Sequence, residues 1–341
     1  MCVMPAPHPA GHPRPGQGHA GAGSGWGSIT PHPIHAEPEG DAYGAYRQEL
    51  IAAGLLVEMG VPGLYGRGRD FEHVIDRFDA IVAAEGAKLQ PELMRFPPIF
   101  NRSSYEQIDH IHNFPDLMGS VHTFLGDERG HRELLGKFER KEDWSRDLTA
   151  ARVMMTPAIC YPLYPTAANK TLPAGGRRVD LQGYAFRHEP SPDPARMQIF
   201  RMHEFVRLGT PEEALEHRAF WLDKGAEIFN SVGLPVETVV ANDPFFGRGG
   251  KVQKAMQREQ ALKFEFVIPI CSAEKPTAIG SCNYHMDHFG VAFDIKTADG
   301  AVAHSACVGF GLERIALALF KTHGLELARW PGEVRNVLAL D

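Results

Sequence analysis

Two arginine-containing segments have the residue types of a nucleotide-phosphate site. Gly309–Arg314 reads Gly-Phe-Gly-Leu-Glu-Arg and leads into an apolar helix, while Phe186–Glu189 reads Phe-Arg-His-Glu. Glycines before a helix let the backbone approach a ligand closely, and arginine offers phosphate oxygens a planar, permanently charged fork. The chain has no Gly-x-x-x-x-Gly-Lys-Ser/Thr segment, the usual phosphate loop. The sequence therefore predicts an ATP site built on arginines.

A carboxylate within an apolar strand pattern is a second candidate for chemistry. In the expected strand Gln198–Leu208, alternation puts Glu204 on one face with four apolar residues, Phe200, Met202, Val206 and Leu208. A carboxylate on such a face is costly to bury unless a cation or a metal ion compensates it. One interpretation is an ion pair of Glu204 with Arg201 or Arg207, and the other is a metal site.

Two cysteines supply what the metal interpretation needs. The five cysteines of the chain include no Cys-x-x-Cys pair, so they predict no disulfide framework. Cys160 precedes the arginine strands and Cys307 lies seven residues before Arg314. Two thiolates and one carboxylate form a zinc ligand set that leaves a fourth position open. The alternative is that both cysteines are ordinary buried thiols.

The composition describes a globular chain with a slight acidic excess. The 341 residues are 43% hydrophobic and 23% charged, as in proteins with a large core. The formal net charge of -7 gives no overall attraction for nucleic acid. No stretch approaches the roughly 20 apolar residues of a membrane span, and the amino terminus lacks an apolar signal core. We therefore expect a cytoplasmic protein with no membrane partner.

The amino-terminal half predicts a tail, one long helix and an edge strand. Residues 1–40 are rich in Pro, Gly, His and Ala and predict a disordered tail, with order from residue 41. Apolar residues at helical spacing predict an amphipathic helix with Asp70 as N-cap, ending near Gly86. Leu93–Phe100 contains two prolines and predicts a strand at an edge or interface, followed by mixed helix and loop over 101–152.

The carboxyl-terminal half predicts a sheet and a second long helix. The strand-like runs are Val179–His188, Gln198–Leu208, Leu262–Ile270 and Thr277–Tyr284. Thr210–Glu213 is a capping box that opens a helix closed by Gly233, with an apolar stripe of Leu215, Ala219, Leu222, Ala226 and Phe229. Strands that follow one another without alternating helices indicate an α+β fold with a mostly antiparallel sheet.

Three of these segments together resemble a known family. Phe186–Glu189, the proline-rich loop and Arg201–Phe205 resemble motif 2 of class II aminoacyl-tRNA synthetases, and Gly309–Arg314 resembles motif 3. The helix at 70–86 with Arg95–Phe100 resembles motif 1, which forms dimers. More narrowly, the chain resembles amino acid:carrier protein ligases, truncated homologues of the zinc-dependent seryl-tRNA synthetases of methanogens. This implies a class II catalytic domain over 41–341, an α+β fold with an antiparallel sheet flanked by helices, and a homodimer.

The resemblance implies an adenylate-forming site. Zn²⁺ would be held by Cys160, Glu204 and Cys307, while Arg187 would hold the α-phosphate of ATP and Arg314 the γ-phosphate as catalytic residues. The remaining positions that match nucleotide-binding residues of the family are Glu189, Arg196, Met197, Phe205, Lys263, Ala278 and Ser281. Phe205 would stack on adenine, although strand alternation places it opposite Glu204 unless the strand bulges. Ala278 replaces a carboxylate of seryl-tRNA synthetases that is tied to the seating of the ATP-bound Mg²⁺.

The same resemblance implies how the amino acid substrate binds and how large its side chain can be. Zinc would take the neutral α-amino group in its open position, a template and Lewis-acid role. A pocket closed by zinc, Cys307 and a tight turn at Val308-Gly309 is expected to suit glycine or alanine, which one methyl group separates only weakly.

The acceptor is expected to be a protein thiol rather than tRNA. The chain has no segment of sustained heptads that could grip tRNA. The segment 243–262 is an insertion relative to seryl-tRNA synthetases and predicts a docking helix for a small acidic, phosphopantetheinylated carrier protein, with the cations Arg248, Lys251, Lys254 and Arg258 on one side. The alternatives are an atypical aminoacyl-tRNA synthetase or a catalytically inactive paralogue, and for these four cations a merely solvated charged face.

Overall fold

The computed structural model describes residues 42–340 apart from 244–250, 252, 253, 256 and 259. The expected tail at 1–40 therefore lies outside the described residues. The described part divides into two compact units, 124–149 and the remainder. In the small unit, α5 (Glu128–Glu139) is capped by the Asp127 carboxylate, which accepts from Gly130 N, and is followed by η2 (Ser145–Asp147). No helix of the described residues is long and apolar enough to cross a membrane.

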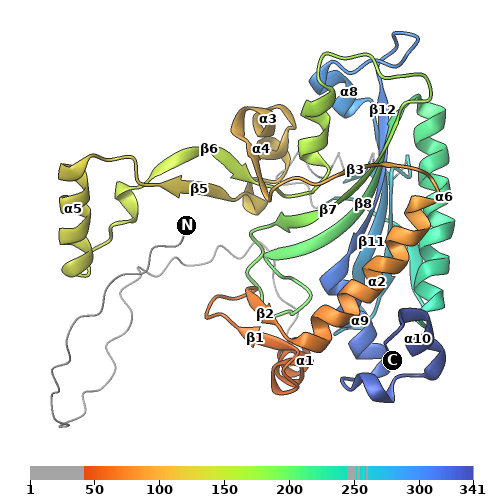
Figure 1. The fold of residues 1–341 in the computed structure, drawn as a ribbon, viewed down its shortest axis with the longest axis horizontal. Coiled ribbons are helices and arrows are strands. Elements are labelled where there is room, and N and C mark those ends of the chain that lie inside the picture. The colour runs from red at the N-terminus through yellow and green to blue at the C-terminus, as the bar shows by residue number, and fades with distance from the viewer. Residues whose placement is uncertain (1–41, 244–250, 252–253, 256, 259, 341) are drawn as a thin grey trace. The chain divides into compact units, whose positions relative to one another are not determined.

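A seven-stranded sheet forms the centre of the larger unit (Figure 1). Its order is β3-β7-β8-β12-β11-β10-β9, and every neighbouring pair is antiparallel except β3 with β7. The strands span Glu92–Met94 (β3), Arg177–Phe186 (β7), Ile199–Gly209 (β8), Glu237–Val240 (β9), Lys263–Ile268 (β10), Thr277–Met286 (β11) and His304–Gly311 (β12). This confirms the α+β class with a mostly antiparallel sheet.

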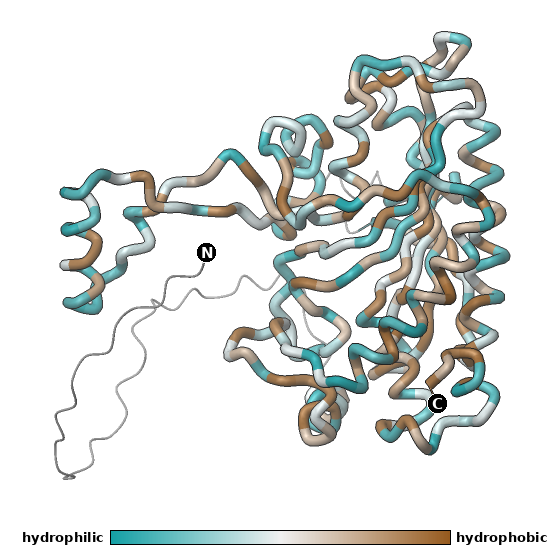
Figure 2. The backbone as a smooth tube through the Cα atoms, viewed as in Figure 1, coloured by the Kyte–Doolittle hydropathy of each residue, from teal (hydrophilic) through white to brown (hydrophobic). Residues whose placement is uncertain are grey.

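Long helices cover one face of this sheet. They are α2 (Arg69–Ala87), α6 (Pro211–Ser231) and α9 (Leu312–His323), and α2 and α9 run side by side. Their apolar side chains form one core with Phe205 and Phe310 of the sheet. The turns of α6 alternate between hydrophilic and hydrophobic along its length (Figure 2), as expected of a helix with one face on a sheet. The other face carries a second core, built with η3 (Tyr161–Ala167) and α8 (His288–Phe293).

Shorter elements surround the two cores. Before the sheet come α1 (Ala42–Ala52) and the hairpin of β1 (Leu56–Glu58) and β2 (Tyr65–Arg67). A three-stranded sheet contains β4 (Ile99–Asn101), β6 (Thr149–Met155) and β5 (Ser120–Thr123). The remaining elements are α3 (Arg102–Gln107), α4 (His110–Asn113), η1 (Pro115–Leu117), η4 (Leu327–Arg329) and α10 (Gly332–Leu338).

The amino-terminal predictions need two corrections. The expected strand Leu93–Phe100 is two short edge strands in different sheets, β3 and β4. Pro97 and Pro98 lie between them, because proline lacks the N–H that a ladder requires. Asp70 is not the N-cap of α2: the cap is Gly68, and Asp70 lies in the first turn, where a carboxylate suits the helix dipole.

The predicted face of α6 is partly wrong, although its ends are confirmed. Thr210 and Glu213 form the expected capping box, and Gly233 follows the helix with φ of +72°. Of the predicted stripe, Phe229 is buried and Leu222 and Ala226 pack partly buried against the core, but Leu215 is 39% exposed. The buried residues are Ala214, His217, Trp221, Gly225, Ile228 and Phe229. A stripe chosen from apolar residues alone omits His217, which is polar but buried. Its Nε2 lies 3.0 Å from the Phe205 carbonyl oxygen, and this hydrogen bond offsets the cost of burial.

Candidate active site

Three buried residues from distant segments meet on the face of the sheet opposite the long helices. One ligand atom from each of Cys160, Glu204 and Cys307 lies within 4.8 Å of the other two. Cys160 immediately precedes η3, whereas the other two residues belong to the paired strands β8 and β12. Cys307 pairs with Val206, two residues from Glu204, so both side chains lie on one face as diagonal neighbours. The sheet register thus assembles the predicted metal set.

The tight turn expected at Val308-Gly309, next to Cys307, is instead part of a strand. Residues 304–311 form one continuous strand, and α9 begins only at Leu312. Gly309 is the cross-strand partner of Glu204. A Cβ atom there would lie 3.0 Å from Met202 Cε and 3.5 Å from Glu204 Cγ. The missing side chain therefore leaves space beside the carboxylate.

The electrostatics of the set suit a divalent cation. Glu204 is only 2% exposed, and its Oε2 atom has no hydrogen-bond partner among the described residues. Burial and the neighbouring Cys307 raise the pKa of Glu204 to about 8. The hydrogen bond from Cys160, assisted by His285, keeps the pKa of Cys307 well below its usual value. Two sulfurs and an oxygen match the ligand types of zinc, and an orphaned buried carboxylate oxygen is what a metal ion would satisfy.

Arg187 adjoins this set just beyond the end of β7. Its Nε donates to the Pro157 carbonyl (3.1 Å), and its guanidinium lies over the Phe200 ring, 5.5 Å from the centroid. Its charge opposes the rise in the pKa of Glu204 that burial causes. Phe200 is half-buried on the same strand face as Glu204. The structure thus brings an arginine and an aromatic ring beside the metal set.

A second arginine group lies around the start of α9. The Arg314 guanidinium donates to the carbonyls of Ala195 (2.8 Å) and Ala278 (3.1 Å). Burial lowers its pKa, with Glu189 opposing that effect and Arg196 and Arg187 adding to it. Arg196 is 44% exposed in its side chain and pairs with Glu189 at 3.4 Å. The predicted Arg187, Glu189, Arg196 and Arg314 therefore interact as one group with an excess of positive charge.

The other predicted nucleotide positions have different surroundings. Met197 is buried in the core of the long helices. Lys263 is paired with Asp243 at 2.5 Å and Glu265 at 3.0 Å, so its charge is already neutralised. Ser281 Oγ accepts from Asn283 Nδ2 (3.2 Å), and the same amide nitrogen lies 3.5 Å from Cys307 Sγ. Ser281 is thus linked to the metal set rather than to the arginines.

The expected adenine contact of Phe205 is wrong. Its side chain is 1% exposed and points into the helix-covered core, where its ring stacks on Trp221 with centroids 4.5 Å apart. Strand alternation holds through β8, so no bulge brings Phe205 to the face of Glu204. The aromatic side chain available on that face is Phe200. The alternation of Phe200 with Glu204 was the signal in the sequence that could have identified it.

Two other residues beside the metal set had no signal in the sequence. Asn283 and His285, on β11, both place a nitrogen 3.5 Å from Cys307 Sγ. The predicted docking cations are described in part: Lys251, Lys254 and Arg258 are helical, with Lys251 and Arg258 exposed, and Arg248 lies outside the described residues.

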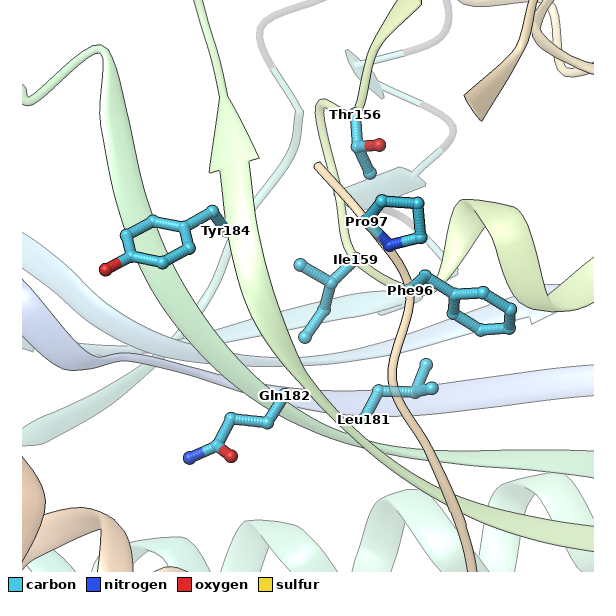
Figure 3. A pocket seen from close by; sticks show the side chains of 7 residues that line it. All are labelled: Phe96, Pro97, Thr156, Ile159, Leu181, Gln182 and Tyr184. Carbon is cyan, nitrogen blue, oxygen red and sulfur yellow. The ribbon is translucent and has the colours of Figure 1, made fainter. Parts of the chain in front are cut away.

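A small hollow beside β7 is a separate feature. Its lining residues are Phe96, Pro97, Thr156, Ile159, Leu181, Gln182 and Tyr184 (Figure 3). It lies next to the metal set, because Ile159 precedes Cys160, but it includes neither an arginine nor a residue of that set. Its mainly apolar lining offers nothing to a triphosphate.

Comparison with solved structures defines the fold class. The larger part of the chain matches the M. kandleri SerRS solved in complex with A. aeolicus tRNASec, with a TM-score of 0.75, 20% identity, and coverage of 90% of this chain and 62% of that one. Prolyl-tRNA synthetase of Cryptosporidium parvum, solved with halofuginone and AMPPNP, gives a TM-score of 0.61 at 15% identity, covering 82% and 52%. The fold is that of a class II aminoacyl-tRNA synthetase catalytic domain, and the chain spans less than two thirds of either synthetase.

Comparison with curated proteins then gives the family. The chain is 40% identical over 291 residues to amino acid--[acyl-carrier-protein] ligase 1 of Bradyrhizobium diazoefficiens, covering 85% of this chain and 89% of that protein. Ligase 2 of the same bacterium is 41% identical, covering 85% and 87%. A type-2 serine--tRNA ligase of Methanopyrus kandleri is 25% identical over 72% of this chain and 50% of that protein. No protein-family model matches. The chain belongs to the amino acid--[acyl-carrier-protein] ligase family and is a ligase.

Proposed function

We propose that this protein activates a small amino acid with ATP and transfers it to the phosphopantetheine thiol of a carrier protein. In the first step a carboxylate oxygen of the amino acid attacks the α-phosphorus of ATP, and the bond to the departing pyrophosphate breaks. In the second step the carrier thiol loses its proton and attacks the adenylate carbonyl, and AMP leaves as the thioester forms. Both steps depend on positioning and on neutralising charge.

The observation that carries this proposal is the buried set of Cys160, Glu204 and Cys307 beside Arg187. The three side chains would hold Zn²⁺, which when bound offers a Lewis-acid position to the α-amino group. The amino acid would then have its amine at the metal set and its carboxylate directed toward Arg187. That arrangement brings the reacting carboxylate oxygen to the α-phosphate, which is what an adenylate-forming enzyme requires.

The arginine group would receive the triphosphate. Arg187 would contact the α-phosphate and Arg314 the γ-phosphate, because planar guanidinium groups pair with phosphate oxygens in two-point contacts. Glu189 and Arg196, which already pair with each other, would lie at the nucleotide, and Phe200 would offer its ring to adenine in place of Phe205. Mg²⁺ would enter with ATP, and Ala278 contributes only a main-chain carbonyl that Arg314 occupies.

The amino acid would be glycine or alanine. Gly309 leaves space beside Glu204, but Met202 Cε is only 3.0 Å from where a Cβ atom would stand. A space of this size accommodates an amino acid with little or no side chain. We infer that Gly309→Ala removes this space, raising the KM for the amino acid while leaving the KM for ATP nearly unchanged.

A small acidic carrier protein and a second copy of this chain would be the partners. Lys251, Lys254 and Arg258 lie on described helical residues, two of them exposed, and such cations attract an acidic partner. The short edge strand β3, with Leu93 71% exposed, leaves apolar surface for the homodimer that the motif 1 resemblance implies. Charge reversal of Lys251 and Arg258 together should raise the KM for the carrier without changing adenylate formation.

ATP–pyrophosphate exchange tests the proposal. We expect exchange with glycine or alanine, its loss after removal of zinc with a chelator, and its recovery when zinc is restored. Cys160→Ala should lose both bound zinc and exchange, whereas Cys271→Ala, a thiol outside the set, should retain both. Absence of exchange with every amino acid would refute the activity, and charging of tRNA instead of a carrier protein would favour a tRNA synthetase.

A further inference from the structure

His285 contacts the metal set from the neighbouring strand. Its Nε2 lies 3.5 Å from Cys307 Sγ, and its Nδ1 lies 3.0 Å from Ser305 Oγ and 3.5 Å from Tyr164 Oη. A 3.5 Å separation suits a hydrogen bond to sulfur, which is larger than oxygen. His285 therefore joins a buried sulfur to two hydroxyl groups.

A β-bulge lies at the position of the imidazole. Along β11 and β12, Asn283 pairs with Cys307 and Tyr284 with Ala306, but Met286 rather than His285 pairs with Ser305. The extra residue is accommodated by a left-handed backbone at Met286, with φ of +55°. Bulges re-aim side chains near functional sites. Here the bulge adjoins His285, which lies on the face of Asn283 and Cys307 by strand alternation.

The surroundings of the ring suit the tautomer with its hydrogen on Nε2. Ser305 Oγ and Tyr164 Oη both reach Nδ1, and either hydroxyl can supply it with a hydrogen. Nε2 then carries the ring hydrogen and points it at the sulfur. The ring is held from the side by Phe289 in an edge-to-face contact, with centroids 5.1 Å apart. Rotation that would exchange the two nitrogens is thus opposed by packing and hydrogen bonding together.

His285 is not itself a member of the metal set. The group of mutually close ligand atoms contains only Cys160, Glu204 and Cys307 among the described residues. The contact of His285 is to one sulfur, and Asn283 Nδ2 makes a second contact to the same sulfur at 3.5 Å. Cys307 therefore receives two N–H groups, whereas neither of these contacts is made to Cys160.

We propose that His285 is a positioning residue that orients Cys307 through its N–H···S bond and sets how strongly that sulfur donates to zinc. Asn283 assists as the second donor. The proposal rests on the zinc site of the proposed function. Hydrogen bonds to a thiolate withdraw electron density from sulfur, and such partners of metal ligands orient them and tune the metal. Of the two cysteines, Cys307 would therefore be the weaker donor.

The test compares zinc affinity and the spectrum of the cobalt-substituted protein among variants. His285→Ala should still bind one zinc ion at saturation, with affinity lowered about 10- to 100-fold in competition with a chelator. The thiolate-to-cobalt charge-transfer band should move to longer wavelength, since the sulfur loses a stabilising hydrogen bond. His285→Gln keeps an N–H at a similar reach and should recover most of the affinity and the band position.

Two further variants test whether misfolding, rather than the lost hydrogen bond, explains the changes expected for His285→Ala. Ser305→Ala leaves the imidazole in place but removes a partner of Nδ1, so we expect a smaller shift of the same band in the same direction. His304→Ala is the matched control, because His304 is also half-buried in this sheet and hydrogen-bonded, but to Tyr284. It should leave zinc affinity and the band unchanged.

The outcomes separate this inference from the proposed function. If His285→Ala has the affinity and band of the parent protein, the positioning role is refuted. If it loses zinc as completely as Cys160→Ala, His285 is a ligand and the inference is also wrong. If Cys160→Ala itself retains zinc, the zinc site of the proposed function fails, and the positioning role falls with it.

Discussion

The two faces of β8 differ in whether their buried ionisable groups have partners of opposite charge. On the helix-covered face, Arg201 pairs with Glu72 and Glu313 at 2.6 Å and 2.9 Å, and His203 contacts Asp79 at 2.6 Å and Asp180 at 3.2 Å. On the other face, Glu204 is buried, and its Oε2 atom has no hydrogen-bond partner in the part of the chain that the structure describes. His203 and Glu204, which are adjacent in the sequence, thus differ in whether a partner of opposite charge lies beside them.

This difference indicates on which face the protein itself compensates the buried charges and on which face a ligand is required. A buried charge is tolerated when partners compensate it, and an orphaned one calls for an explanation such as an absent ion. The ion pairs of the helix-covered face tie β8 to α2 and, through Glu313, to the start of α9. That face joins the sheet to the helices, and we assign the proposed chemistry to the opposite face.

The largest expected effect comes from removing the orphaned carboxylate. Glu204→Gln should abolish zinc retention and lower ATP–pyrophosphate exchange by about 10³-fold, which corresponds to about 4 kcal/mol. The melting temperature of the zinc-free protein should not fall, because the lost charge had no complete set of partners. Metal analysis, exchange assays and thermal unfolding measure these quantities. A stable variant that keeps zinc and activity would remove the functional distinction between the faces.

The adjacent residue should give the opposite result. Phe205→Ala removes a fully buried ring that stacks on Trp221, so the free energy of unfolding should fall by about 3 kcal/mol or more. At temperatures where the variant is folded, zinc content and the KM for ATP should match the parent protein. Phe200→Ala is the counterpart: it should raise the KM for ATP. If Phe205→Leu instead raised the KM for ATP strongly, that result would support the adenine contact of Phe205 that the structure contradicts.

A smaller loss of stability is expected where the helices meet the sheet. A Cβ atom at Gly86 would lie 2.0 Å from the Phe205 ring, so Gly86→Ala should destabilise the fold by about 2 kcal/mol through overpacking. Gly332→Ala is the control, because nothing lies within 4 Å of its added Cβ. Combining Gly86→Ala with Phe205→Leu should give less than the sum of the single effects in denaturant unfolding. If the two losses of stability were additive, the added methyl group at position 86 would not clash with the Phe205 ring.

The smallest effect is a pH dependence of the helix-covered face. Burial lowers the pKa of His217 from 6.5 to about 4, so between these values the unfolded chain binds more protons than the folded one. Stability therefore falls with falling pH in this window, and His217 should account for roughly 1 kcal/mol of the loss at pH 5.5. Unfolding of His217→Gln at pH 7.5 and 5.5 should show a correspondingly shallower loss. An unchanged pH slope would mean that the histidine is not buried uncharged.

Residues whose environment follows from local patterns were predicted well. The capping box at Thr210 and Glu213 and the strands that became β7, β8, β10 and β11 agree with the structure. Period-2 alternation even separates Phe205 from Glu204, and the structure follows that local pattern. The adenine contact of Phe205 came from the family resemblance, and it conflicts with this alternation.

Residues that depend on neighbours from other segments were missed. The buried stripe of α6 includes His217, whose burial requires the Phe205 carbonyl from another element. Leu93–Phe100 separates into strands of two sheets because each half finds a different partner strand. His285 reaches Cys307 because β11 pairs with β12, and nothing in its own segment specifies that partner strand.

By itself the sequence determined the α+β class, the order of the three motifs and the ligand types of the metal set, because these follow from local periodicity and side-chain chemistry. The tertiary structure alone decided that Cys160, Glu204 and Cys307 meet, that Phe200 faces them and that His285 and Asn283 contact one of the two sulfurs. The physical reason is that strand order and register join residues far apart in the chain, and no local pattern contains that information.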